Sequence, residues 1–213
     1  MTVPLISPLG DTAITLTFGE GISAELNDRV VEEANRIAAA RFPGVRDVVP
    51  AYASLAVHYD PLRIGYADLR ALLTSLSPPA TSPIQRAPRS HLIPVTYDGE
   101  DLADVARRTN LTVEDVMSIH SAAEYRVFVI GFVPGFAYLG PLDPRLVVTR
   151  RESPLKRVPA GSVAIAEAQT GVYPAETPGG WHLIGTTDVK MFDATREPPA
   201  LLAVGDRVRF TRA

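Results

Sequence analysis

The chain has 213 residues, of which 46% are hydrophobic and 21% are charged, and its formal net charge is −3. This length suits one large domain or two small ones, each able to bury a core. A slightly acidic chain argues against nucleic acid as a partner, and no apolar stretch is long enough to span a membrane. The absence of cysteine excludes disulfides, thiolate nucleophiles and zinc–cysteine sites. Because the N-terminus also lacks a secretory leader, we expect a cytoplasmic protein.

The first third of the chain predicts, in order, a strand, a helix, two strands and a second helix, at residues 12–18, 23–40, 45–49, 54–59 and 66–76. Ser23 predicts the N-cap of the first helix, and Phe42-Pro43-Gly44 its end. The order β-α-β-β-α lacks one strand of a ferredoxin-like domain. Residues 92–97 either supply that strand or belong to the next domain.

A proline-rich stretch separates the two predicted domains. Residues 77–90, SPPATSPIQRAPRS, contain four prolines and show no hydrophobic period, which indicates an extended linker. A long loop ordered against one domain is an equal alternative. We place the first domain at residues 1–87, including most of this linker, and the second at 88–213.

After the linker, the pattern predicts two short helices, a strand, and a final strand, at residues 101–109, 112–121, 125–130 and 207–211. Thr112 and Asp115 resemble a capping box, with aspartate in place of the usual glutamate or glutamine. Many short strands with turn signals favour either a barrel or a sandwich, and periodicity alone leaves both open.

The segment between Phe128 and Thr187 is dense in turn-forming residues. It holds eight of the chain's 15 glycines and seven of its 19 prolines. Aromatic and β-branched residues are interleaved with them, which a disordered low-complexity tract would lack. Glycine permits backbone angles that other residues avoid, and proline fixes its own, so the segment predicts ordered short strands joined by defined turns.

Five strings in this segment, GFVPGFAYLG, LDPRL, VPAGSVAIA, QTGVYP and PGGWHLIG, carry a resemblance to a known family. The chain resembles, over essentially its whole length, the family that contains the B subunit of prokaryotic 5-oxoprolinase, subunit 1 of proteins named allophanate hydrolase, and the sporulation-kinase inhibitor KipI. The resemblance implies a cyclophilin-like β-barrel after the ferredoxin-like domain, and hence an α+β protein.

The resemblance also implies a function. It implies a subunit, inactive alone, of an ATP-dependent 5-oxoprolinase, which opens the lactam of 5-oxoproline to glutamate. The implied partners are a second subunit, of the type found as the C subunit of 5-oxoprolinase or as subunit 2 of allophanate hydrolase, and the lactamase or A subunit. Because the chain has no P-loop pattern, we expect ATP with Mg²⁺ at a site shared with the partner and not bound tightly by this chain alone.

Two alternatives remain open within the family. In the first alternative the chain is an inhibitor that binds a sensor histidine kinase, as KipI does. In the second it is subunit 1 of an allophanate hydrolase or urea-carboxylase-type carboxyltransferase. Neighbouring genes would discriminate them, because a gene for the second subunit favours an enzyme and a gene for a sensor kinase favours the inhibitor.

Basic residues cluster between positions 145 and 157, with Arg145, Arg150, Arg151, Lys156 and Arg157 against a single acid. Guanidinium offers a planar fork that matches carboxylates and phosphates. We predict that Arg151 is catalytic and that the other three arginines bind substrate. The alternative is a solvated loop with salt bridges back to the first domain.

Among the four histidines, His120 is the predicted catalytic residue. It lies at the end of a predicted helix, where the helix dipole favours the imidazolium ion and raises the pKa, as an acid or an anion contact requires. The alternative is a histidine that only caps the helix. His182 is expected to face solvent or a cleft. The histidines are far apart in sequence, so no metal site is predicted.

The QTGVYP turn offers an amide and a hydroxyl that suit a ligand pocket. We predict that Gln169 and Thr170 bind substrate or line an interface. The single tryptophan, Trp181, follows two glycines and is expected in the core, with the glycines making room for it.

Overall fold

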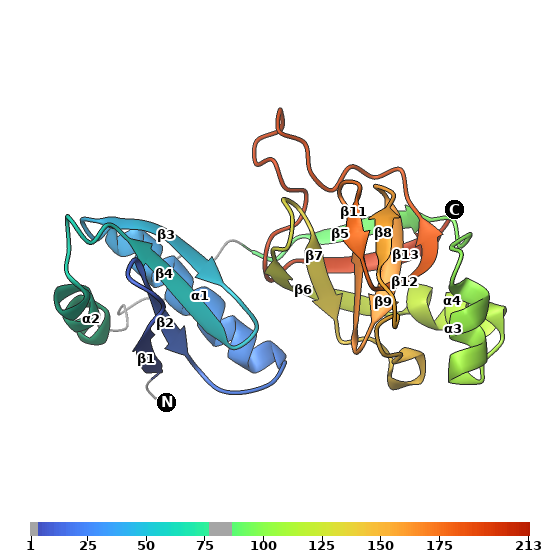
Figure 1. The fold of residues 1–213 in the computed structure, drawn as a ribbon, viewed down its shortest axis with the longest axis horizontal. Helices are drawn as coiled ribbons and strands as arrows, with labels where there is room; N and C mark the ends of the chain where they lie inside the picture. The colour runs from blue at the N-terminus through green and yellow to red at the C-terminus, as the bar shows by residue number, and fades with distance from the viewer. Residues whose placement is uncertain (1–3, 77–86) are drawn as a thin grey trace. The chain divides into compact units, whose positions relative to one another are not determined.

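A computed structural model of the chain describes residues 4–76 and 87–213 (Figure 1). The chain divides into two compact units, Met1–Ala87 and Pro88–Ala213. Residues 77–86, most of the predicted linker, lie outside the described part.

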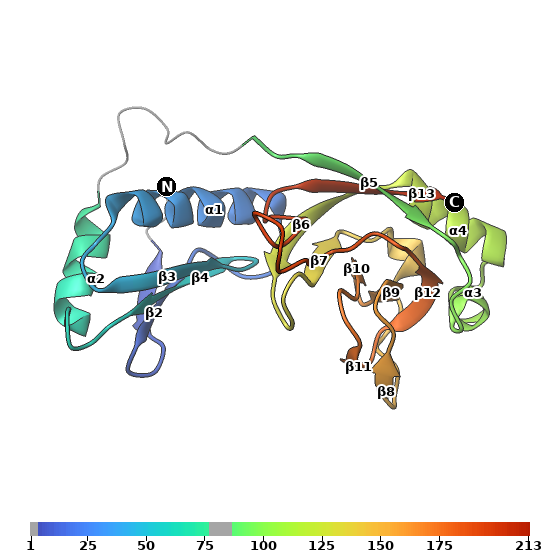
Figure 2. The same ribbon diagram turned by 90° about the horizontal axis from the view of Figure 1, so that it is seen from above.

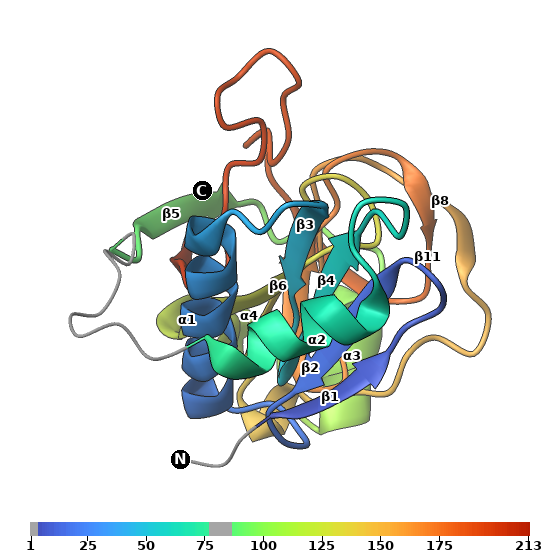
Figure 3. The same cartoon turned by 90° about the vertical axis from the view of Figure 1, so that its left-hand side faces the viewer.

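The first unit consists of a four-stranded antiparallel sheet and two helices. Its elements are β1 (Leu5–Pro8), β2 (Ala13–Thr17), α1 (Ala24–Ala40), β3 (Val45–Pro50), β4 (Ser54–Tyr59) and α2 (Tyr66–Ser75). The strand order is β1-β2-β4-β3. Strand β1, which the sequence pattern does not predict, pairs with β2 at the edge of the sheet (Figure 3).

The helices of this unit begin and pack as the hydrophobic pattern predicts. The Ser23 hydroxyl accepts the Leu26 N–H, which confirms the predicted N-cap of α1. One hydrophobic core joins both helices to the sheet, with Val30 and Ile37 from α1 and Leu69 and Leu73 from α2. Its strand residues lie on alternate positions, as a sheet with one buried face requires.

The second unit is built on a seven-stranded sheet with the order β12-β9-β10-β7-β6-β13-β5. Its strands are β5 (Ser90–Val95), β6 (Glu124–Ile130), β7 (Ala137–Gly140), β9 (Ser162–Ala166), β10 (Gln169–Val172), β12 (His182–Thr186) and β13 (Arg207–Arg212). A separate two-stranded sheet joins β8 (Leu155–Val158) to β11 (Thr177–Gly179). The short helices are α3 (Leu102–Thr109), α4 (Val113–Ala122) and η1 (Pro144–Leu146).

The seven-stranded sheet curls until its two ends approach. β5 runs parallel to β13 (Figure 2), and residues 92–97, which the sequence could not assign to either domain, belong to the second unit. Just after β5, the Thr96 N–H donates to the Thr186 carbonyl at 2.9 Å, and the Thr186 N–H donates to the Thr96 carbonyl at 2.8 Å. These two hydrogen bonds join the end of β5 to β12, the other end strand. The α+β class is confirmed.

Around β9 both faces of this sheet are buried, over two different cores. In β9, Val163 and Ile165 point into the larger core, whereas Ala164 and Ala166 point into a smaller, aromatic one. The residue types alternate large and small along the strand, and the small side leaves room for aromatic rings. The capping box of α4, at one end of the larger core, is confirmed, because Thr112 and Asp115 exchange hydrogen bonds in both directions.

Candidate functional site

A pocket of about 250 Å³ lies over the smaller, aromatic core of the second unit. Phe136 is the centre of its wall, and its ring centroid lies 5.0 Å from Tyr138, 5.2 Å from Tyr173 and 5.5 Å from Trp181. The rings meet edge to face, the arrangement that aromatic quadrupoles favour. Trp181 is only 4% exposed, so its predicted core position is confirmed, and it also lines the pocket.

Glycines and one strained residue shape this pocket. A Cβ at Gly171 would come within 3.2 Å of the Phe136 ring and 2.9 Å of the Ala137 carbonyl, so only glycine lets the strand lie this close. Phe132, in the GFVPGF string, has a left-handed backbone with φ 72° and lines the pocket with a ring that is 61% exposed. Such a conformation in a non-glycine residue is costly and is often found at binding sites.

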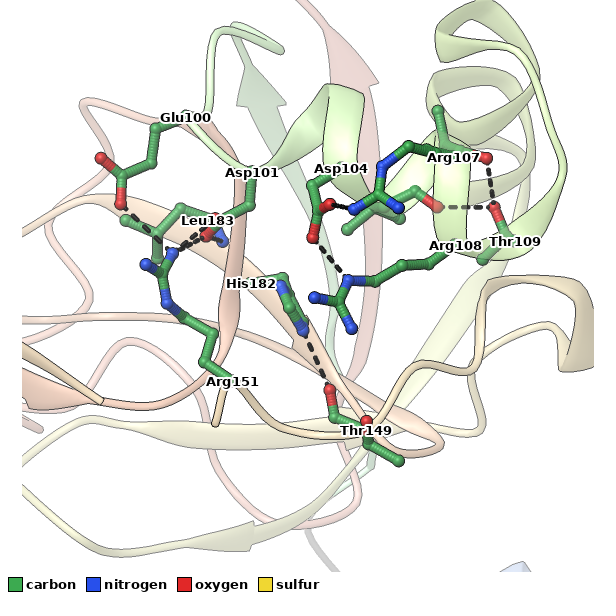
Figure 4. Close-up of polar contacts among 12 residues, drawn as sticks. Glu100, Asp101, Asp104, Arg107, Arg108, Thr109, Thr149, Arg151, His182 and Leu183 are labelled. Atoms are coloured by element: carbon green, nitrogen blue, oxygen red, sulfur yellow. Dashed lines mark hydrogen bonds and ion pairs between the residues drawn. The ribbon is translucent and has the colours of Figure 1, made fainter. Parts of the chain in front are cut away.

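The predicted basic cluster does not form one site. Arg145 donates to Asp143, and Arg157 donates two hydrogen bonds to Glu176, at 2.9 and 3.0 Å. Arg151 pairs with Asp101 and, at 3.3 Å, with Glu100 (Figure 4). All these carboxylates belong to the second unit, so these three arginines form salt bridges within that unit.

Arg150 differs from its neighbours. Its side chain lines the aromatic pocket, and within residues 4–76 and 87–213 no carboxylate lies within ion-pair distance of it. Its positive charge acts on Tyr138 and Tyr173, where it opposes the rise in pKa that burial causes in both phenols. The guanidinium charge therefore lies close enough to both phenols to influence them.

The residues on either side of Arg150 are held by hydrogen bonds. The carbonyl of Thr149 accepts a bond from His182 Nε2 at 2.9 Å, and the Arg151 N–H donates to the Gly180 carbonyl at 2.9 Å. Because a carbonyl only accepts, His182 carries its proton on Nε2. The prediction that His182 faces solvent or a cleft is wrong, since it is 2% exposed.

The Arg151 side chain points to Glu100 and Asp101 in the loop before α3, as Figure 4 shows. Asp101, just before that helix, takes both the Arg151 guanidinium, at 2.6 Å to Oδ2, and the Leu183 N–H, at 2.8 Å. The carboxylate thus ties the loop before α3 to β12 and to the segment that carries Arg150. The catalytic role predicted for Arg151 finds no support in this geometry, which gives the guanidinium a structural partner.

His120 lies in the larger core, away from solvent, with 0% exposure. Its ring stacks on Phe210 at 4.6 Å, and its nitrogens lie 2.8 Å from the Tyr97 hydroxyl and 2.9 Å from the Thr170 hydroxyl. Burial lowers its pKa from 6.5 to about 3. The predicted rise in pKa and the predicted anion contact are therefore wrong, because desolvation outweighs the helix dipole.

The hydrogens of this buried network can be assigned. The Thr170 hydroxyl donates to the Ala164 carbonyl at 3.0 Å, so it accepts from His120 Nε2–H. His120 Nδ1 then accepts from the Tyr97 hydroxyl. Thr170 is fully buried in this network, so its predicted place in a pocket is wrong. Gln169 pairs with Ala166 at the start of β10 and does not line the aromatic pocket.

Neither a metal-binding cluster nor a membrane-spanning helix is found among the described residues. They hold no group of three or more His, Cys, Asp or Glu side chains that could bind a metal ion. They also include no helix that is long and apolar enough to cross a membrane.

Comparison with known proteins gives the same family as the resemblance carried by the five glycine-rich strings. Residues 4–202 match the family described as carboxyltransferase domain, subdomain C and D, and the chain belongs to this family. It is 40% identical to the Bacillus subtilis protein named as the B subunit of 5-oxoprolinase, over 97% of this chain and 92% of that one. The Escherichia coli O157:H7 protein of the same name is 38% identical, over 95% and 93%. The resemblance seen in the sequence is confirmed.

A solved structure has the same fold and a similar sequence. The crystal structure of TTHA0988 superimposes with a TM-score of 0.84 and 46% identity over 94% of this chain. This chain spans 40% of the length of that protein.

Proposed function

We propose that this chain is the B subunit of an ATP-dependent 5-oxoprolinase, which hydrolyses the lactam of 5-oxoproline to glutamate. The observation that carries the proposal is the 40% identity to a B subunit of 5-oxoprolinase over nearly the full length of both chains. The partners are then the A and C subunits of the same enzyme, and the location is the cytoplasm, which suits a chain without cysteine.

The reaction requires more than this chain offers. A lactam is inert because of amide resonance, so opening it with ATP requires cationic groups around the developing negative charge. The aromatic pocket contains one guanidinium and measures about 250 Å³, below the roughly 300–1,000 Å³ of pockets for drug-sized ligands. The residues that line this pocket do not fit ATP by themselves. ATP therefore binds largely through a partner subunit, and the isolated chain is inactive.

The family also supports a finer description of the fold. We infer a ferredoxin-like first domain in which β1 takes the edge position that the last strand takes in the usual order. The hydrogen bonds between Thr96 and Thr186, which link the two ends of the sheet, support a cyclophilin-like barrel for the second domain.

Co-expression with candidate A and C subunits tests the proposal. Size-exclusion chromatography should yield a complex, and that complex should hydrolyse ATP only when 5-oxoproline is present. ATP hydrolysis by the pure isolated chain would contradict its dependence on partners. A stable complex that ignores 5-oxoproline would contradict the substrate, and the absence of any complex would contradict the enzyme role.

A further inference from the structure

We propose that the aromatic pocket binds 5-oxoproline itself, with Arg150 holding the carboxylate and the Phe136, Tyr138 and Trp181 rings packing against the lactam ring. This inference rests on the proposed function and assigns its substrate to one site on this chain.

The size of the pocket favours a small ring. Its volume of about 250 Å³ suits a compact molecule with one ring rather than a nucleotide or a peptide of several residues. Phe136, Tyr138 and Trp181 present apolar ring surface to the inside, and the small Ala164 and Ala166 support them from the sheet. A five-membered ring is small enough for this pocket and can bury its apolar atoms against such a surface.

The charge of the pocket favours a carboxylate. Arg150 is the pocket's positively charged side chain, and among the described residues its charge is not used by an ion pair. An arginine fork bonds a carboxylate with two parallel N–H···O bonds, which fixes orientation as well as charge. 5-Oxoproline carries one carboxylate beside its ring, so one guanidinium and one aromatic wall match its two parts.

The backbone on both sides of Arg150 is already fixed, which lowers the cost of binding. The Thr149 carbonyl is held by His182, and the Arg151 N–H is held by Gly180, itself a pocket residue. Arg151 is further anchored through Asp101 (Figure 4). The backbone that carries Arg150 is therefore held in place before a ligand binds, and such preorganisation increases affinity.

The single tryptophan provides a direct test. Trp181 lines the pocket and is the only tryptophan in the chain, so its fluorescence reports ligand there without any catalysis. The isolated chain is titrated with 5-oxoproline and with 2-pyrrolidinone, which has the same ring but no carboxylate. Arg150→Gln should weaken 5-oxoproline binding roughly ten- to hundredfold and leave 2-pyrrolidinone binding unchanged.

Two matched variants sharpen the result. Lys156→Gln removes the same charge from the same segment, but its exposed side chain does not line the pocket, so it should bind 5-oxoproline like the wild type. Arg150→Lys keeps the charge and loses the fork, so its affinity should lie between those of the wild type and Arg150→Gln.

Kinetics of the assembled enzyme separate this inference from the proposed function. A complex that hydrolyses ATP with 5-oxoproline, and whose kcat/KM is the same with Arg150→Gln, overturns the pocket assignment and keeps the function. Carboxylate-dependent quenching of Trp181 with no 5-oxoproline-dependent ATP hydrolysis supports the pocket and overturns the function. Equal affinity of the wild type for 5-oxoproline and 2-pyrrolidinone overturns the role of Arg150.

Discussion

Polar side chains are buried and hydrogen-bonded to one another on one face of the curled sheet, and one is open to a pocket on the other. In the larger core, His120, Tyr97 and Thr170 satisfy one another, and the imidazole is sealed from water. On the aromatic face, Arg150 keeps its charge available beside a pocket. A histidine is often the first candidate for a catalytic residue. This comparison shows that burial and satisfied hydrogen bonds decide which polar group is available to bind a ligand.

The largest expected effect is on the pH dependence of stability, through His120 in the larger core. Folded His120 has a pKa of about 3, against 6.5 for a free imidazole, so the unfolded chain takes up a proton first as the pH falls. The stability that His120 contributes is fully present above pH 6.5. It should fall by about 1.4 kcal/mol per pH unit between pH 6.5 and 3. His120→Gln cannot titrate and should lose this slope, as measured by urea unfolding followed through Trp181 fluorescence.

A second variant controls for damage to the network. Thr170→Val removes a partner of the imidazole but leaves the histidine buried, so it should lower stability and retain the slope. Tyr97 and Tyr125, which surround the ring, have pKa values raised by burial and stay neutral across this range. Equal pH slopes in the wild type and His120→Gln would show that the imidazole is not sealed.

The sequence predicted local features better than long-range ones. The Ser23 cap, the Thr112–Asp115 capping box and the burial of Trp181 all follow from residue type and near neighbours, and all are confirmed. β1 was missed because Pro4 precedes it and Pro8 is its last residue, and only its pairing with β2 makes it a strand.

The site was harder to predict, because it depends on contacts between distant segments. Arg145, Arg150, Arg151 and Arg157 look equivalent along the chain. Asp101 and Glu176, which occupy two of them, lie 50 and 19 residues away. The burial of His120 likewise depends on Phe210, ninety residues further on. A clearer signal lies in the alternation of small and large residues in VAIA, where Ala164 and Ala166 mark the face that carries the aromatic rings.

The next largest expected effect is on stability and concerns the aromatic pocket, which is lined by two adjacent glycines. A Cβ at Gly179 would lie 2.3 Å from the Tyr173 hydroxyl oxygen, whereas one at Gly180 would lie 3.7 Å from Pro154. Tyr173 is 2% exposed and has little room to move. Gly179→Ala should therefore cost about 2 kcal/mol of stability and distort the pocket, while Gly180→Ala should cost less than about 0.5 kcal/mol. Thermal unfolding of the matched pair checks this, and equal losses would show that Tyr173 yields.

The smallest expected effects are changes in stability that differ between two neighbouring arginines, Arg150 and Arg151. Arg151→Gln removes a largely buried partner of Asp101, with side chains 23% and 13% exposed, and should cost about 1.5 kcal/mol. Arg150→Gln removes a charge that, among the described residues, no ion pair uses, so its stability should change by less than about 0.5 kcal/mol. Thermal unfolding of both variants measures the difference. If Arg150→Gln were instead the more destabilising change, its charge would be part of the fold rather than available to a ligand. Arg151 thus fastens the segment, through Asp101, to the loop before α3 and to β12, while Arg150 lines the pocket.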